Sequence, residues 1–260
     1  MTKNIFSYTQ EEVIKLFESL FWKEKVLCPR CKHSVYRLSS RPLYQCTHCR
    51  HQFSLKSISI MRKSHLCLKT WLCAFAVICE GNVNGVMLAK HLGVSYKAAW
   101  LLFHKVRNLM KALSAKQKHR LHHILHKFIL IPGIKKFQRE KKYPLQLIEC
   151  NNKLSPTHFH IHLVHSISSE NIKTLFSGKK IPTIFEAPST FSCVFKELTD
   201  RLEGLYHHGC RKHPQRYIEE FCVFYLYQVP EIRFEKLLSM IGSRNLLLPY
   251  KILIKEPLAL

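Results

Sequence analysis

The sequence predicts an α+β multidomain fold, and three observations support this prediction. Two cysteine pairs lie near the start of the chain, three helical segments follow them, and the hydrophobic period becomes that of strands from Lys127 onward. The 260 residues are enough for two or three small domains. Hydrophobic residues make up 47% of the chain, which is the apolar content of a folded protein rather than a disordered one.

The N-terminal segment, residues 1–24, is predicted to form one amphipathic helix over residues 9–22. Thr9 is a good N-cap, and Glu12 three positions later completes a capping box. Apolar side chains then recur at helical spacing, at Val13, Leu16, Phe17, Leu20 and Phe21. We interpret this segment as a helix that packs on its neighbour.

Residues 25–60 contain the strongest motif of the chain. Two CxxC pairs, Cys28–Cys31 and Cys46–Cys49, are separated by fourteen residues. Each pair places two thiolates on one tight turn, and two such turns complete a tetrahedral site for a soft divalent cation. Iron–sulfur ligation is the alternative, but two symmetric pairs are typical of a zinc ribbon. A domain this small has little core, so bound zinc supplies most of its folding free energy.

The remainder of this region has strand character. Residues 35–38, 43–44 and 52–55 are predicted strands, with Arg41-Pro42 near a turn. Three histidines, His33, His48 and His51, are further candidate ligands. Because four thiolates already complete the site, we interpret these histidines as bystanders or phosphate contacts.

Residues 66–113 are predicted to form a helix-turn-helix domain. Lys69 to Cys79 and Val83 to Leu92 have helical patterns, Gly93-Val94 forms a turn, and Ser95 caps a longer helix that ends near Leu113. This order of two helices around a tight turn is the outline of a DNA-binding motif. An ordinary helical hairpin with a solvated face is the alternative.

The last of these helices is predicted to have two different faces. The buried face is apolar and consists of Ala99, Leu102, Phe103, Val106, Met110 and Leu113. The exposed face is basic and consists of Lys97, Trp100 or Leu101, His104, Arg107 and Lys111. A basic exposed face suits entry into the major groove, because it meets phosphates and guanine edges together.

The second half of the chain alternates between strand and helix. Residues 114–126 are predicted to form a basic, histidine-rich linker, and residues 127–260 are predicted to form one α/β or α+β domain. Predicted strands are Phe128 to Ile131, Leu145 to Cys150, Phe159 to Val164 and Ile181 to Phe185. A short helix is predicted from Ser168, and longer ones at Thr190 to Leu202 and His213 to Tyr227.

The charge of the chain is strongly basic and unevenly distributed. The formal net charge is +24, and residues 25–120 contain 18 basic residues and one acidic residue, Glu80. A solvated protein surface normally interleaves both signs, so this composition indicates a polyanionic partner, most often nucleic acid. A genome that favours lysine is the alternative. We expect phosphate contacts from the cations that follow the ribbon, Arg50, Lys56, Arg62 and Lys63.

The sequence predicts neither secretion nor membrane insertion. The first residues, MTKNIFSYTQEE, lack an apolar signal core, and no apolar run approaches the length of a membrane span. We expect the protein in the bacterial cytoplasm, or in the nucleus of a eukaryote. The eleven cysteines are therefore expected to be reduced.

Several segments together resemble the zinc-ribbon transposases of the DDE type, a bacterial insertion-sequence group related to the eukaryotic Merlin elements. These segments are CPRC, YQCTHCRHQFS, LKTW, LAKHLGVSYKAAWLLFHKVR and GLYHHGCRKHPQRYIEEF, in this order. The resemblance implies that residues 127–260 form a ribonuclease-H-like domain. In that family, three carboxylates of this domain hold two Mg²⁺ ions that cut and join DNA.

The chain departs from this family at all three carboxylate positions. The segment ILHKFILIPGIKK, which matches the family's first catalytic strand, contains no acid, and the second position lies in Thr183-Ile184-Phe185-Glu186. The third position falls on or near Ser192. The single aspartate of the chain, Asp200, is interpreted as a surface residue. We therefore predict a degenerate catalytic domain without catalytic residues and without the Mg²⁺ expected of the family.

The resemblance and this departure give three functional hypotheses. The first is a transposase-like protein that binds double-stranded DNA, at terminal inverted repeats in the family, without strand transfer. The second is an active transposase that uses unorthodox carboxylates such as Glu149, Glu186 and Glu197. The third is a zinc-ribbon transcriptional regulator. All three hypotheses imply Zn²⁺ at Cys28, Cys31, Cys46 and Cys49. They also imply no membrane partner, and they allow the chain to form a homodimer.

Overall fold

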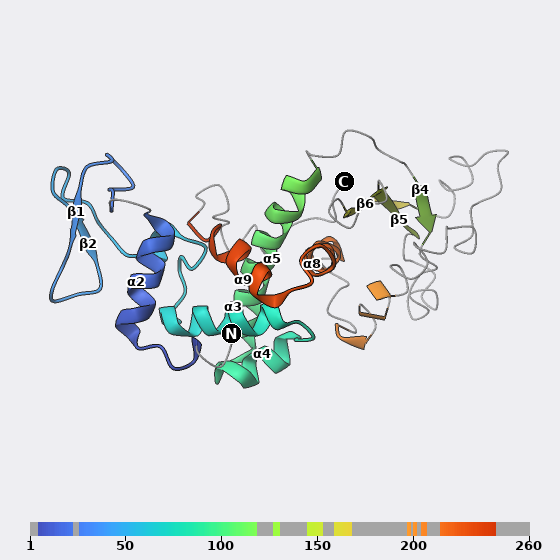
Figure 1. The fold of residues 1–260 in the computed structure, drawn as a ribbon, viewed down its shortest axis with the longest axis horizontal. Helices are drawn as coiled ribbons and strands as arrows, with labels where there is room; N and C mark the ends of the chain where they lie inside the picture. Colours follow the sequence, from blue (N-terminus) through green and yellow to red (C-terminus); the bar gives the residue numbers. More distant parts are fainter. Residues whose placement is uncertain are drawn as a thin grey trace. The chain divides into compact units, whose positions relative to one another are not determined.

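The computed structural model describes residues 5–22, 26–118, 127–130, 145–152, 159–167, 197–198, 200–201, 204–206 and 214–242 (Figure 1). The chain divides into two compact units. The first contains the N-terminal part up to Leu109 together with a segment that begins at Val229, and the second contains Met110 to Gln228. None of the described helices combines the length and the apolar content needed to cross a membrane.

Helix α2, Gln10–Phe21, forms as the sequence predicts. The hydroxyl of Thr9 accepts a hydrogen bond from the Glu12 amide, and the Glu12 carboxylate accepts one from the Thr9 amide at 2.7 Å. This capping box satisfies amide groups that have no partner within the helix. Val13, Ile14 and Phe17 are buried, which makes the apolar stripe the contact face.

A three-stranded antiparallel sheet follows, with strands in the order β1-β2-β3. The strands are Val35–Arg37, Tyr44–Cys46 and Gln52–Phe53. Val35 pairs with Cys46, and Tyr44 pairs with Phe53. Strands of two or three residues provide few ladder hydrogen bonds and little buried area, so this sheet needs support from outside its own core.

Three helices follow the sheet: α3, Leu68–Glu80, α4, Gly85–Leu92, and α5, Tyr96–Lys118. Helix α5 begins in the first unit and belongs to the second from Met110 onward. The Asn84 side chain caps α4 by accepting hydrogen bonds from the amides of Val86 and Met87. Gly93 ends α4 in the left-handed conformation, with φ of 62°. This is a C-cap that glycine adopts without steric cost. The predicted helices and the turn between the last two are confirmed.

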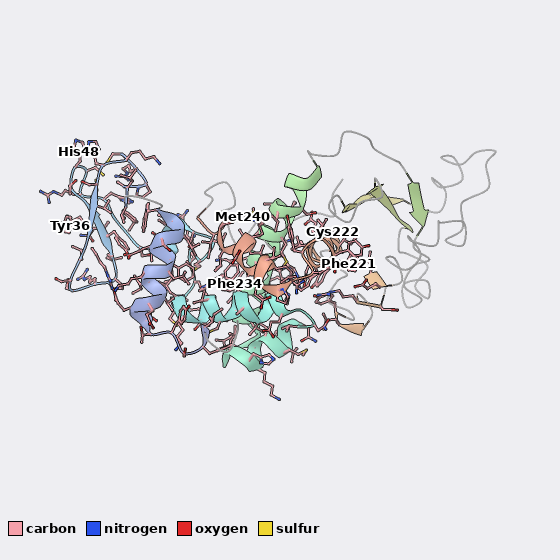
Figure 2. The ribbon with its side chains drawn as sticks, viewed as in Figure 1. Tyr36, His48, Phe221, Cys222, Phe234 and Met240 are labelled. Atoms are coloured by element: carbon pink, nitrogen blue, oxygen red, sulfur yellow. The ribbon has the colours of Figure 1, made fainter. Side chains whose placement is uncertain are left out.

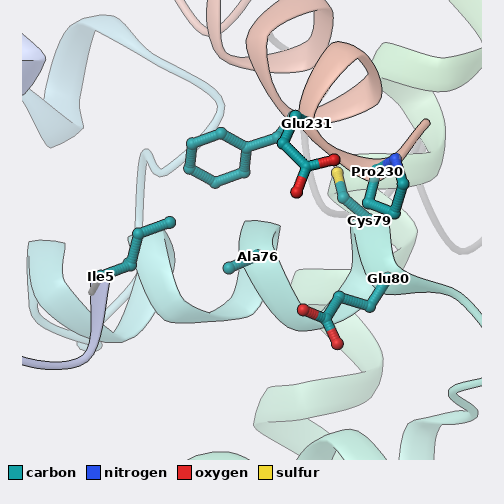
Figure 3. A pocket seen from close by; sticks show the side chains of 7 residues that line it. Ile5, Ala76, Cys79, Glu80, Pro230 and Glu231 are labelled. Carbon is teal, nitrogen blue, oxygen red and sulfur yellow. The ribbon is translucent and has the colours of Figure 1, made fainter. Parts of the chain in front are cut away.

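Helix α9, Pro230–Leu238, belongs to the first unit although it lies late in the chain. Pro230 occupies the first turn, where no backbone donor is needed. The buried Arg233 reaches α3, and its Nε donates to the carbonyl oxygen of Cys79 at 2.8 Å. Figure 3 shows the junction between α3 and α9, with Ala76 and Cys79 facing Pro230 and Glu231. The cavity there is about 10 Å³, which leaves room for one water molecule at most.

This packing bears on the predicted boundary of the last domain, which stays a prediction. The sequence places residues 127–260 in one C-terminal domain, whereas the segment from Val229 clusters with the N-terminal unit. At Gly242, an added Cβ would lie 2.6 Å from the Phe21 ring. Such close approach explains why a glycine is suited to this position.

The second unit contains an antiparallel sheet with strand order β4-β5-β6, formed by Lys127–Leu130, Leu145–Asn152 and Phe159–Ile167. Helix α8, Pro214–Leu226, packs on β6. The first three predicted strands and the helix over residues 213–227 are confirmed. The predicted strand over residues 181–185 and the helix from Ser168 lie outside the described residues. The predicted helix over residues 190–202 is described at four positions, all helical.

We expect Arg233→Met to destabilise the protein by about 1–3 kcal/mol, because the buried carbonyl of Cys79 loses its donor. Urea unfolding followed by circular dichroism measures this change. Lys236→Met, on the exposed side of the same helix, is the matched control and should alter stability by less than about 0.5 kcal/mol. Equal effects from the two variants would show that α9 does not depend on this contact.

Candidate metal centre and nucleic-acid interface

The four ribbon cysteines converge on one point. The Sγ atoms of Cys28 and Cys49 are 3.7 Å apart, and Cys31 Sγ lies 3.4 Å from the Sγ atoms of both Cys46 and Cys49. A tetrahedral zinc ion with Zn–S bonds of 2.3 Å would separate its sulfur ligands by about 3.8 Å. A disulfide is excluded at these distances, since its sulfurs lie about 2 Å apart. The donor set and its geometry fit a zinc-binding ribbon.

The electrostatics of these thiols favour a bound cation. Burial raises the pKa of Cys28, but the amides of Cys31 and Arg30 and the thiols of Cys49 and Cys31 lower it to about 6. At Cys49 the amide of His51 lowers the pKa, whereas burial and the three neighbouring thiols raise it to about 12. One thiolate therefore makes the next one harder to form. A divalent cation removes this conflict, because it stabilises all four thiolates together.

The two cysteine knuckles have the same sequence pattern and the same backbone geometry. Cys28-Pro29-Arg30-Cys31-Lys32-His33 and Cys46-Thr47-His48-Cys49-Arg50-His51 both read CxxC, a basic residue, then histidine. The amide of Cys28 donates to the His33 carbonyl at 2.8 Å, and the amide of Cys46 donates to the His51 carbonyl at 3.1 Å. The basic residue adopts positive φ in both knuckles, 64° at Lys32 and 57° at Arg50. The ribbon therefore has internal pseudo-symmetry about its metal site.

The histidines beside the knuckles stack rather than converge on an ion. The rings of His33 and His48 lie 4.2 Å apart with an interplanar angle of 12°. Cys31, His33 and His48 bring three ligand atoms together, but ring lone pairs lie in the ring plane, so parallel rings do not direct both lone pairs at one ion. His51 stacks on Phe53. Figure 2 shows His48 at one end of the ribbon.

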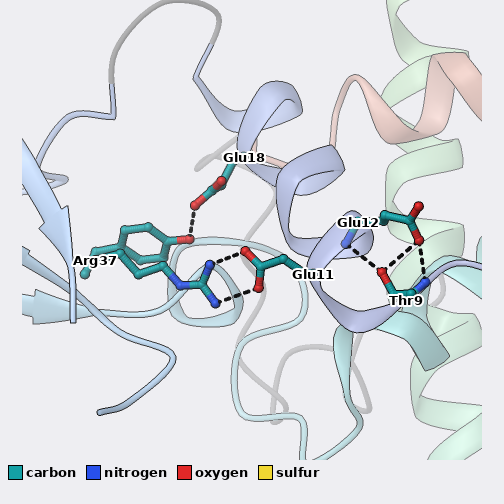
Figure 4. A network of polar contacts seen from close by, with 6 residues as sticks. Thr9, Glu11, Glu12, Glu18 and Arg37 are labelled. Carbon is teal, nitrogen blue, oxygen red and sulfur yellow. Dashed lines mark hydrogen bonds and ion pairs between the residues drawn. The ribbon is translucent and has the colours of Figure 1, made fainter. Parts of the chain in front are cut away.

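Helix α2 is attached to the ribbon by polar and aromatic contacts (Figure 4). The Arg37 guanidinium forms a bidentate ion pair with Glu11, at 2.6 and 3.1 Å, and the Tyr44 hydroxyl donates to Glu18. The Trp22 ring lies against Tyr44 and Phe53, with centroids 5.5 and 6.4 Å away. The helix and ribbon therefore form one module rather than two separate segments.

Two lysines hold the connector between the ribbon and α3. Lys56 Nζ donates to the carbonyls of Ser64 and Leu66, both at 3.1 Å. Lys105 Nζ, from α5, donates to the Arg62 carbonyl at 2.7 Å and lies over the Trp71 ring. Burial lowers the pKa of Lys105 to about 8. Two of the three ammonium hydrogens of Lys56 therefore serve the connector, and its contact with phosphate stays a prediction.

The predicted apolar face of α5 is confirmed, but its predicted basic face is wrong at two positions. His104 and Arg107 are buried, with exposed fractions of 0% and 2%. The Arg107 guanidinium stacks over the Phe103 ring at 3.8 Å, and the His104 ring lies 4.1 Å from Trp100. Between Leu102 and Met110 every residue except Lys105 is buried, so this part of α5 is enclosed on more than one side. Neither His104 nor Arg107 is available to DNA in this arrangement.

The other predicted DNA contacts are exposed. Arg50 lies beside the metal site, Arg62 and Lys63 lie on the connector, and Lys97 and Lys111 lie on α5. Lys97 follows Tyr96, which is 56% exposed at the start of α5. Exposure permits contact with a polyanion. Whether these side chains bind DNA stays a prediction.

Most of the positions that bear on catalysis lie outside the described residues. Glu186 and Ser192 lie there, and the backbone of Glu149 is described in β5, paired with Phe128 and His162. Strand β4 has the sequence KFIL and carries no carboxylate. Glu197 and Asp200 are exposed on a helical segment, as expected for Asp200.

Comparison with known proteins gives one match. Residues 8–52 match the family model described as the transposase zinc-ribbon domain. The match includes α2 together with the ribbon, which agrees with the contacts between them. No curated protein and no solved structure matches the chain. The chain is therefore transposase-like in its ribbon, with a region that fits zinc binding.

Two residues of this region were missed by sequence reasoning. Lys32 occupies the same place in the first knuckle as Arg50 does in the second, and the repeated CxxC-basic-His pattern could have identified it. Lys105 had no comparable pattern. Its role depends on a connector carbonyl 43 residues away in the chain, and such long-range pairing leaves no trace in local periodicity.

We expect Cys46→Ser to reduce bound zinc and to unfold the ribbon, because an alcohol is a poor ligand for a soft cation. Zinc content by mass spectrometry and near-ultraviolet circular dichroism of the Tyr44 environment measure both effects. Cys67→Ser is the matched control. Cys67 lies outside the cluster and caps α3 through its Sγ, a role that serine also performs. Equal zinc content in the two variants would refute the ligand assignment.

Proposed function

We propose that this chain is a transposase-related, double-stranded-DNA-binding protein that lacks strand-transfer activity. The observation that carries the proposal is a ribbon that fits zinc and matches a transposase domain, within a region of 18 basic residues and one acidic residue. A surface with this charge attracts nucleic acid over distances up to the Debye length. Released counterions then supply much of the binding free energy.

We infer that α4 and α5 act as a helix-turn-helix, with the start of α5 in the major groove. Support comes from the tight turn at Gly93 and from the Ser95 cap, whose Oγ accepts a hydrogen bond from the Ala98 amide. Tyr96 and Lys97 are exposed at this end. In helix-turn-helix proteins the first residues of the second helix contact base edges. Arg62 and Lys63 on the connector are the accompanying phosphate contacts.

The inference that strand transfer is absent rests on the carboxylates. A pair of Mg²⁺ ions requires anionic oxygen ligands between them, because the two cations otherwise repel. The position of the family's first aspartate falls in a segment without any acid, and β4 within it reads KFIL. We propose that the C-terminal region is a degenerate ribonuclease-H-like domain, and that it binds no catalytic Mg²⁺.

Lys97→Ala is expected to weaken binding to a 30-bp duplex by about 1 kcal/mol, roughly fivefold in Kd, and to reduce the salt slope by about one. Fluorescence anisotropy over a range of KCl concentrations measures both quantities. Lys15→Ala removes an equal charge from the exposed side of α2 and is the control. A variant at Lys97 that binds like wild type would remove α5 from the interface.

We expect no cleavage or joining of DNA in the presence of Mg²⁺ or Mn²⁺. The substrate is a duplex that carries the sequences flanking the gene, where inverted repeats would mark a mobile element. Denaturing gels detect single nicks. Metal-dependent nicking that Glu186→Gln abolishes would establish the active-transposase alternative instead. Tight binding to promoter DNA without flanking repeats would favour a transcriptional regulator.

A further inference from the structure

Each of the two knuckles has a basic residue at a position whose backbone conformation favours glycine. Lys32 and Arg50, the knuckle cations, each follow the second cysteine of a CxxC pair and have φ of 64° and 57°. Glycine and asparagine adopt this left-handed region most readily, because a Cβ with a long side chain crowds the following carbonyl. Glycine would therefore be the residue favoured by the fold alone at both positions.

A basic residue with positive φ also occurs on the connector. Among the described residues, four non-glycine residues have positive φ, and three of them are basic: Lys32, Arg50 and Lys63. Basic residues make up 41 of the 260 in the chain, so composition alone does not explain this enrichment. Unfavourable backbone conformations that persist point to a role for the side chain outside local folding.

The described part of the chain makes no use of the charges of the knuckle cations. Both residues are exposed, and neither side chain has a hydrogen bond or an ion pair with another described residue. Arg37, by contrast, uses its guanidinium to hold α2 through Glu11. The two kinds of cation on the ribbon therefore differ in what their charged groups contact.

The knuckle cations lie at the same end of the ribbon. Lys32 immediately precedes His33, and Arg50 lies two positions after His48. The parallel stack of these two rings, 4.2 Å between centroids, brings the knuckles together. The Ser34 and Thr47 hydroxyls add a hydrogen bond across the same junction at 3.1 Å. Both left-handed turns thus belong to one surface beside the metal site.

We infer that the knuckle cations form a second DNA-contacting surface, which binds backbone phosphates independently of α5. This inference rests on the proposed function and deepens it, because it assigns a nucleic-acid contact to the metal end of the ribbon. A competing role exists. Four thiolates with one Zn²⁺ carry a net charge of −2, and nearby cations offset that charge. The two roles differ in what is lost when the charges are removed.

The test replaces both residues by glycine in the full-length protein, as Lys32→Gly with Arg50→Gly. Glycine removes the charges and suits the backbone, so the fold is retained. Binding is measured by anisotropy against a random-sequence pool of labelled 30-bp duplexes over a range of KCl concentrations. Loss of two phosphate contacts should reduce the slope of log K against log[salt] by about 1.8. We also expect the Kd at 100 mM KCl to rise at least tenfold.

Two further variants support the comparison. Lys32→Arg with Arg50→Lys keeps both charges and should bind like wild type. Lys15→Gln removes one charge from α2 of the same module and should leave the slope unchanged. If the glycine variant loses zinc or structure, Lys32→Asn with Arg50→Asn repeats the test, since asparagine also tolerates the left-handed region.

Each outcome decides the inference. A glycine variant with normal zinc content, a reduced slope and weaker binding supports it. An unchanged slope overturns it, and faster zinc release to a chelator in that variant would assign the cations to the metal site. Wild-type protein that fails to bind any duplex would refute the proposed function itself, and so is distinguished from failure of the inference alone.

Discussion

The ribbon depends on the conflict among four thiols that meet at one point. Sulfur atoms 3.4 to 3.7 Å apart cannot all carry negative charge unless a cation lies between them. The three short strands contribute too little burial to impose this arrangement by themselves. The folding free energy of the ribbon is therefore largely the binding free energy of its metal, as in other small metal-dependent domains.

What lies beside the ribbon depends on that centre in turn. Cys46 ends β2, and Tyr44, two residues earlier on the same strand, contacts Glu18, Trp22 and Phe53. Loss of the metal would release the strand that positions Tyr44, and with it the aromatic contacts that hold α2. The burial of Tyr44 and its hydrogen bond to Glu18 also raise its pKa, which keeps the hydroxyl protonated and able to donate at physiological pH. Helix, ribbon and metal thus form one cooperative module.

Local sequence patterns predicted much of this fold because nearby residues determine where its helices and turns begin and end. The capping box at Thr9, the CxxC pairs and the left-handed cap at Gly93 each lie within a few residues of the structure they determine. The predicted exposure of His104 and Arg107 is wrong because residues 102–110 of α5 are enclosed, and the contacts of Lys56 with the Ser64 and Leu66 carbonyls were not predicted. Helical periodicity separates apolar from polar positions, but it does not reveal that an arginine stacks on Phe103 within a buried segment.

The place of α9 in the first unit bears on how the degenerate catalytic region that we propose would persist. If residues 127–260 were a separate domain, a chain that had lost its catalytic activity could also lose these residues without any effect on the N-terminal unit. Arg233 instead supplies a buried donor to the Cys79 carbonyl at the end of α3, and Gly242 packs against Phe21 of α2. A chain that ended before Val229 would leave that carbonyl without its donor and uncover apolar surface on α3. Selection for the N-terminal unit alone would then retain the residues that follow Gln228, whether or not residues 110–228 cut DNA.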